Sequence, residues 1–183
     1  MKNILCFEGE WKINIHKKPE RFDFNSEPIL SMLIEYHKCD AIYRHILTNE
    51  DLKLYIEYFN RNKREWNKID IVYIACHGWF HSISLEGENR NVDLQELADI
   101  AGDFFRDKIV HFSCCKTLAN TSEVEHFKSI TGAKLVCGYK KSVDAMKSAI
   151  ADTALLNELI TSNKPGNIKN IAISKFRKTY KSL

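Results

Sequence analysis

The residues of this chain best suited to chemistry are a histidine and a cysteine that each follow a short apolar run. One run ends at His77, which Gly78 follows, and another ends at Cys114 and Cys115. An imidazole can take the proton of a nearby thiol, and the thiolate is the nucleophilic form of cysteine. A glycine leaves room for substrate and presents its N–H to a developing oxyanion. The pattern predicts thiol catalysis by His77 and Cys115, with the N–H groups of Gly78 and Cys115 as the oxyanion hole.

Short apolar runs alternate with longer stretches of helical period, which predicts an α/β fold with a mostly parallel central sheet and helices on both faces. We expect strands at Asn3–Glu8, Asp40–Leu47, Ile69–Cys76, Lys108–Cys114 and Lys134–Gly138. We expect helices at Glu27–His37, Asn49–Trp66, Leu94–Phe105, Ser122–Ile130, Val143–Thr161 and Ile168–Tyr180, and a hairpin or extended loop at His81–Gly87. Ligands of such sheets bind at the carboxyl ends of the strands, where His77 and Cys115 would meet.

Length and composition indicate one domain over residues 1–183, because a core of this size folds without disulfides or a metal. The formal charge of +3 is too small to indicate a nucleic-acid partner. The sequence has no apolar run long enough for a membrane span. Most of the six cysteines lie in apolar runs, as free thiols do in reducing compartments, which favours the cytoplasm. No cofactor is implied, and without a C-x-x-C pair we expect no metal site.

The ordered set of segments resembles the caspase-like cysteine peptidases of clan CD. Ser113-Cys114-Cys115-Lys116-Thr117 is similar to the Ser-Ala-Cys-x-Thr nucleophile motif of the CHAT-type branch, with Cys114 in place of alanine. This register selects Cys115 as the nucleophile. The segment from Thr131 to Val136, followed by Gly138 and Tyr139, resembles the strand and loop that run beside the substrate in that group. The resemblance implies a caspase-like three-layer sandwich and a cysteine endopeptidase acting on protein or peptide substrates.

Three further residues are candidate substrate-binding groups: Asp144, Tyr139 and Glu8. Asp144 would suit a basic P1 side chain by charge complementarity, but an aspartate before a helix is equally an N-cap. Glu8 would orient His77, contribute to a pocket, or be a surface charge before a turn. We interpret His111 as structural or edge-facing, and Cys114 and Cys137 as small buried hydrophobes.

Two other functions fit the same sequence. One is a catalytically silent caspase-like module that regulates a partner in a bacterial signalling or defence system, since one fold hosts many roles. The other is a different thiol chemistry on His77 and Cys115, such as deamidation or acyl transfer. In either case a separate sensor or activator protein, or a homodimer, would supply regulation.

Overall fold

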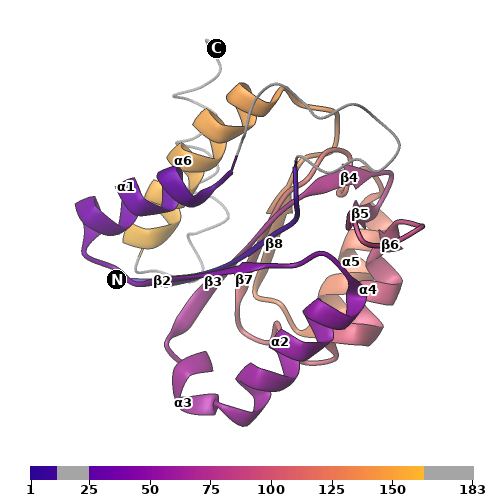
Figure 1. Cartoon of the computed structure of the whole chain (residues 1–183), viewed down its shortest axis with the longest axis horizontal. Helices are drawn as coiled ribbons and strands as arrows, with labels where there is room; N and C mark the ends of the chain where they lie inside the picture. Colours follow the sequence, from indigo (N-terminus) through magenta and orange to yellow (C-terminus); the bar gives the residue numbers. More distant parts are fainter. Residues whose placement is uncertain (12–24, 163–183) are drawn as a thin grey trace.

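The computed structural model describes residues 1–11 and 25–162, which form a parallel sheet covered by helices and a smaller antiparallel sheet at one end (Figure 1). The elements are β1 (Asn3–Glu8), α1 (Glu27–His37), β2 (Ala41–His45), α2 (Asn49–Arg61), α3 (Lys63–Trp66), β3 (Ile69–Ala75), β4 (His77–Trp79), β5 (Ser82–Ser84), β6 (Val92–Asp93), α4 (Leu94–Ala101), β7 (Ile109–Ser113), α5 (Thr121–Thr131), β8 (Leu135–Gly138) and α6 (Ala145–Thr161).

The main sheet has five strands in the order β2-β1-β3-β7-β8, and every neighbouring pair is parallel. Helices α1 and α6 cover one face, whereas α2, α4 and α5 cover the other (Figure 1). When the strands of this sheet alone are numbered, the order is 2-1-3-4-5, the doubly wound order seen in flavodoxin-like folds. The ligand site of such folds lies between β1 and β3, where the strand order reverses. The predicted α/β fold with a mostly parallel, helix-flanked sheet is confirmed.

Two hydrophobic cores lie on the two faces of the main sheet because alternate strand residues point to opposite sides. In β1, Leu5 and Phe7 belong to the larger core with α2, α4 and α5. Ile4 and Cys6 belong to the smaller core with α1 and α6. All four are buried. The strands of the sheet interior are therefore apolar on both faces, which is why short continuous apolar runs identify them.

The antiparallel sheet follows β3 directly in sequence: the chain leaves the main sheet at Cys76 and continues as β4. It has the order β4-β5-β6. Ser82–Ser84, within the stretch expected as a hairpin or loop, forms its middle strand. This sheet holds His77 and Gly78 at the carboxyl edge of the main sheet.

Two expected helices are shorter than the sequence pattern suggests. The stretch Asn49–Trp66 divides into α2 and α3 at Asn62, whose φ of −107° and ψ of 55° are not helical. Helix α4 ends at Gly102, which has a φ of 53° that favours glycine. The expected helix Ile168–Tyr180 lies outside the described residues.

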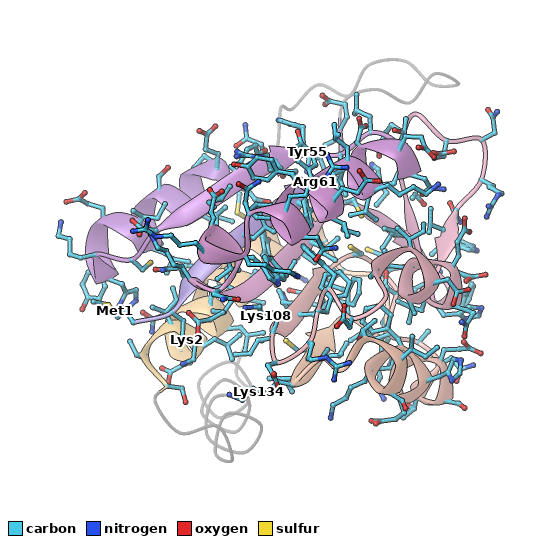
Figure 2. All side chains as sticks on the ribbon, turned by 90° about the horizontal axis from the view of Figure 1, so that it is seen from below. Met1, Lys2, Tyr55, Arg61, Lys108 and Lys134 are labelled. Carbon is cyan, nitrogen blue, oxygen red and sulfur yellow. The ribbon has the colours of Figure 1, made fainter. Side chains whose placement is uncertain are left out.

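Long basic side chains contact backbone at the amino end of the sheet, where Figure 2 labels Lys2 and Lys108. Lys2 Nζ donates to the carbonyl oxygen of Leu159 at 2.9 Å. Lys108 Nζ donates to the carbonyl oxygen of Ile69 at 2.6 Å and lies 4.7 Å from the Trp66 ring centroid. Partial burial lowers the pKa of both lysines.

Within residues 1–11 and 25–162, no helix has the length and apolar character needed to cross a membrane.

Candidate functional site

The ends of β3 and β7 place the predicted catalytic residues at one edge of the sheet. The parallel register pairs Ala75 with Ser113 as the last residues of the two strands. Cys76 and Cys114 follow side by side, with their Sγ atoms 3.4 Å apart. His77 and Cys115 come next on each chain segment, so the carboxyl edge brings together the two elements that carry them.

Cys115 is the one cysteine of the chain that is partly exposed, since the other five are buried. Its Sγ accepts a hydrogen bond from the backbone N–H of Val143 at 3.4 Å and can donate to the carbonyl oxygen of Val143 at 3.6 Å. Lys116, the next residue, has a φ of +59°. A non-glycine residue in this left-handed region marks a turn that the surrounding structure has to hold in place. The thiol therefore projects from a sharp turn directly after a buried strand.

Gly78 packs directly against the turn that carries Cys115. A Cβ at this position would lie 2.5 Å from the carbonyl oxygen of Cys115, 2.6 Å from Oγ1 of Thr117 and 2.8 Å from Cβ of Cys114. These separations are too short for any side chain, so the close approach of β4 and this turn requires glycine. The assignment of the Gly78 and Cys115 N–H groups to an oxyanion hole stays a prediction.

His77 is exposed and packs against Trp11, which follows β1. The two ring centroids lie 4.9 Å apart at an interplanar angle of 72°, an edge-to-face contact. Trp11 Nε1 donates to Oε1 of Glu8 at 2.7 Å. Glu8 is thus connected to His77 through the indole ring of Trp11.

Glu8 itself is completely buried at the end of β1. Its carboxylate accepts hydrogen bonds from the backbone N–H of Ser26 at 2.8 Å, from the Ser26 hydroxyl at 2.9 Å and from the Tyr43 hydroxyl. Burial, together with the hydrogen bond to Glu8, raises the pKa of Tyr43. Glu8 has no exposed surface with which to contact a substrate, and the interpretation of Glu8 as a surface charge is wrong. Through these hydrogen bonds, Glu8 instead connects the end of β1 to the N-cap of α1, to β2 and to Trp11.

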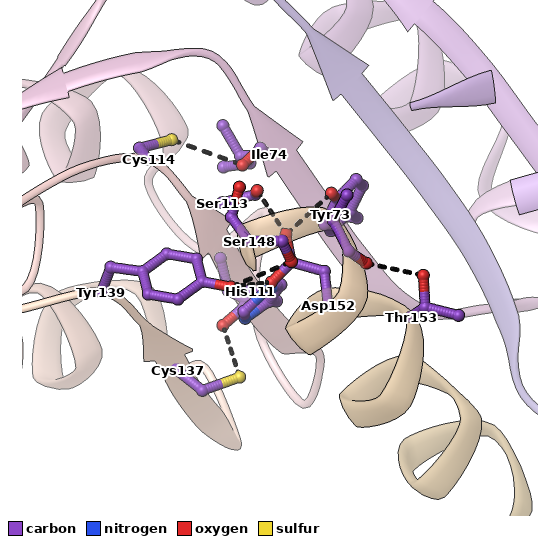
Figure 3. A network of polar contacts seen from close by, with 12 residues as sticks. Tyr73, Ile74, His111, Ser113, Cys114, Cys137, Tyr139, Ser148, Asp152 and Thr153 are labelled. Atoms are coloured by element: carbon purple, nitrogen blue, oxygen red, sulfur yellow. Dashed lines mark hydrogen bonds and ion pairs between the residues drawn. The ribbon is translucent and has the colours of Figure 1, made fainter. Parts of the chain in front are cut away.

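A buried polar network beside the site centres on Asp152 of α6, a residue that the sequence interpretation missed (Figure 3). Its carboxylate lies 2.7 Å from His111 Nε2, and accepts from the Tyr139 hydroxyl at 2.6 Å and the Tyr73 hydroxyl at 3.0 Å. It also accepts from the Ser113 hydroxyl. One carboxylate therefore connects α6 to β3, to β7 and to the end of β8.

The charges of this network stabilise each other. Burial disfavours the protonated imidazole, but the Asp152 carboxylate outweighs it and holds the pKa of His111 well above its usual range. Burial likewise disfavours the charged carboxylate, but the imidazolium outweighs it and lowers the pKa of Asp152. His111 and Asp152 form a buried ion pair. The expectation that His111 is structural fits this position, whereas an edge-facing position does not, because His111 is buried within β7.

Tyr139 and Asp144 lie in the segment between β8 and α6, beside Cys115. The Tyr139 hydroxyl donates to Asp152, and burial raises the pKa of this phenol. Asp144 is the N-cap of α6, where its Oδ1 accepts from the N–H groups of Met146 and Lys147, both at 3.1 Å. The N-cap alternative for Asp144 is thus confirmed. Contact of Tyr139 or Asp144 with a substrate stays a prediction.

Cys114 and Cys137 are buried, as expected. Cys114 Sγ lies 3.4 Å from the carbonyl oxygen of Ile74 and from Cys76 Sγ, so it faces the core beneath Cys115. The hydrogen bond to Cys114, together with burial, raises the pKa of Cys76 well above its usual range. In the part of the chain that the structure describes, no cluster of three or more histidine, cysteine or acidic side chains could hold a metal ion.

At the switch point between β1 and β3, where flavodoxin binds its flavin, the described residues include two acidic ones, Glu10 and Glu86. Glu10 N–H donates to Oε2 of Glu86 at 3.0 Å, and burial raises the pKa of Glu86 to about 7. A Cβ on Gly9 would lie 2.8 Å from Cβ of Cys76, so this glycine packs on protein and does not form an open cradle. The described residues do not fit a phosphate group, which binds where backbone N–H groups and basic side chains converge.

Several solved structures are similar to this chain, including a quinone oxidoreductase and an azoreductase. An NAD(P)H:quinone oxidoreductase from Methanothermobacter marburgensis is 12% identical, with 90% of this chain and 99% of that chain covered and a TM-score of 0.47. An azoreductase from Bacillus anthracis strain Sterne is 10% identical, with 100% of this chain and 98% of that chain covered and a TM-score of 0.41. The quinone oxidoreductase and azoreductase activities are those of these two proteins and are not assigned to this chain. The sequence matches no curated protein.

These findings correct the interpretation drawn from the sequence. Neither solved structure is a peptidase, and the family match is not to the caspase-like peptidases. The assignment to clan CD, the cysteine endopeptidase function with its hydrolase class, and the silent caspase-like module are therefore wrong. The family profile that matches covers residues 1–182 and is described as a family of unknown function, DUF6642. With nearly its whole length matched, the chain belongs to the DUF6642 family.

Proposed function

We propose that this protein is a thiol-dependent acyl-transfer enzyme in which Cys115 carries the acyl group. One observation carries the proposal: the only partly exposed thiol of the chain projects from a tight turn against which the His77-Gly78 segment is packed. Catalytic thiols lie in such partly exposed strand-end positions, whereas buried thiols are inert. Because the other five cysteines are buried and free, a reducing setting such as the cytoplasm suits this chemistry.

The reaction begins when the imidazole of His77 takes the proton of Cys115. The thiolate attacks the carbonyl carbon of an activated acyl donor, an ester or a thioester, and a tetrahedral oxyanion forms. N–H groups of Gly78 and Cys115 stabilise that oxyanion. Its collapse breaks the bond to the leaving group, which takes the proton from His77. An acceptor nucleophile then attacks the thioester, transfers its own proton to His77, and releases the thiol.

The experiment is acylation of the intact protein with p-nitrophenyl acetate, followed by mass spectrometry. We expect one acetyl group on Cys115, removable by neutral hydroxylamine as thioesters are. Cys115→Ala should abolish this adduct, and Cys114→Ala, the matched control at the adjacent buried thiol, should retain it. His77→Ala should slow acylation roughly a hundredfold, the lower end of what a general base contributes. An adduct that resists hydroxylamine, or one that disappears only in Cys114→Ala, contradicts the proposal.

A redox function is the second candidate, favoured by the separation of 3.4 Å between the Sγ atoms of Cys76 and Cys114. Hydrogen peroxide would take two electrons and two protons from this pair, giving a disulfide and two water molecules. The raised pKa of Cys76 keeps its thiol protonated, which slows this step. Loss of the mass of two hydrogen atoms on peroxide treatment, absent in Cys76→Ala, would favour this function over acyl transfer.

A further inference from the structure

The residue that follows Cys115 is a lysine held between two exposed aromatic rings. Lys116 Nζ lies 4.1 Å from the ring centroid of Trp79 and 4.8 Å from that of Phe80. These rings belong to β4 and the turn after it, and they are 54% and 51% exposed. An ammonium over an aromatic face is attracted by the ring quadrupole. The rings thus hold a positive charge at the rim of the candidate site.

The backbone of Lys116 is fixed as firmly as its side chain. Its N–H donates to the carbonyl oxygen of Lys141 at 3.3 Å. Its own carbonyl oxygen accepts from the N–H groups of His81 at 3.2 Å and Ala119 at 3.0 Å. These hydrogen bonds hold the left-handed conformation, which a residue with a side chain adopts rarely and which is typical of functional sites.

No carboxylate of the described residues forms an ion pair with Lys116. Among the ion pairs formed within residues 1–11 and 25–162, none includes Lys116, Lys140 or Lys141. Asp144 is the acidic residue of the loop between β8 and α6, which also contains Lys140 and Lys141. Its carboxylate accepts hydrogen bonds from the first N–H groups of α6. A fixed cation with no carboxylate partner among the described residues, one residue from the nucleophile, is a preorganised anion site.

We infer that Lys116 binds a carboxylate of the acyl donor, while Trp79 and Phe80 contact its apolar part. The substrate class is then an acyl compound that bears a second, anionic group. This inference rests on the proposed function, because it concerns the molecule that Cys115 attacks. It assigns Lys116 to specificity and leaves proton transfer with His77.

The test compares alkylation of Cys115 by iodoacetate and by iodoacetamide, two reagents of similar size that differ in charge. In the wild type, the rate ratio of iodoacetate to iodoacetamide should exceed the ratio for free cysteine at the same pH. Lys116→Gln should lower this ratio roughly twofold to fivefold, the size expected for the loss of a solvent-exposed ion pair. Lys116→Arg should retain it, since the charge is kept.

Lys140→Gln is the matched control, because it removes one charge from the neighbouring loop between β8 and α6, where the Lys140 ammonium contacts Oγ1 of Thr121 at 3.2 Å. Its ratio should change less than that of Lys116→Gln. High salt should reduce the wild-type preference, as screening predicts. If Cys115 is alkylated selectively and the iodoacetate-to-iodoacetamide rate ratio is the same in the wild type and in Lys116→Gln, the inference about Lys116 is wrong. That result leaves the proposed function standing. Failure of p-nitrophenyl acetate to form a thioester on Cys115 overturns the proposed function.

Discussion

Replacing Asp152 by alanine should be among the most destabilising single changes in this protein. The carboxylate is 1% exposed, faces the His111 imidazolium at 2.7 Å and accepts from three hydroxyl groups. Asp152→Ala leaves a buried positive charge without its partner. It also removes the acceptor shared by the buried Tyr73 hydroxyl and the partly buried Ser113 and Tyr139 hydroxyls. Breaking a buried ion pair in this way costs about 3–5 kcal/mol of unfolding free energy. For a chain of this length the melting temperature should fall by roughly 6–20 °C.

The pH dependence of that loss distinguishes an ion pair from simple packing. The pKa of Asp152 is lowered in the folded state, so its contribution is present above the unfolded value of about 4 and is lost as pH falls through the folded pKa. The pKa of His111 is raised, so its contribution is complete below about 6.5 and is lost as pH rises through the folded pKa. The difference between wild type and variant should therefore be largest between about pH 4 and 6.5.

Urea unfolding followed by circular dichroism, from pH 4 to 9, measures this difference. Asp152→Asn is the informative companion, because it keeps the shape and an acceptor oxygen but removes the charge. We expect Asp152→Asn to lose less stability than Asp152→Ala. A loss below about 1 kcal/mol in Asp152→Ala at pH 6, or a loss that does not vary with pH, would refute the reasoning, since neither fits a broken buried pair.

Two further changes test the packing of the site. Gly78→Ala forces a Cβ to within 2.5 Å of the Cys115 carbonyl oxygen, so urea unfolding should show a loss of about 1–3 kcal/mol and acylation of Cys115 should slow. An unchanged acylation rate of Cys115 would show that Gly78 does not shape the site. Trp11→Phe removes the N–H bonded to Glu8 but keeps an aromatic ring beside His77, whereas Trp11→Ala removes both. Acylation should therefore slow more in Trp11→Ala, and equal rates would show that the ring does not position His77.

Much of the fold follows from local sequence signals. The bounds of β1 and α1 agree with those expected from apolar runs and helical period. Thr48 and Asp51 form a capping box at the start of α2, because each side chain accepts from the backbone N–H of the other residue. A threonine followed three residues later by an acidic residue is the local sequence signal of this motif. The break at Asn62 had no comparable signal, since the helical pattern of apolar residues continues across it to Trp66.

The polar network could not be read from local pattern, because its members are distant in sequence. Asp152 lies 41 residues from His111 and within a helical stretch, where an aspartate is expected to face solvent. A signal was nevertheless present: a histidine enclosed by the apolar residues of a central strand needs a buried polar partner. Register alone could place His77 and Cys115 at one edge, but the contact of Trp11 with His77 depends on the path of the chain after β1.

Four separate segments converge on the candidate site, and buried carboxylates tie two of them to the sheet. Glu8 holds Trp11 against the ring of His77 from one side. Asp152 anchors α6, whose preceding loop supplies the Val143 N–H that contacts the Cys115 thiol. Buried charges that are paired are costly to assemble but rigid once formed, since leaving one of the charges unpaired is strongly penalised. The arrangement therefore fixes both reacting side chains from outside the site, which leaves the exposed surface between Lys116 and Trp79 to select what is bound.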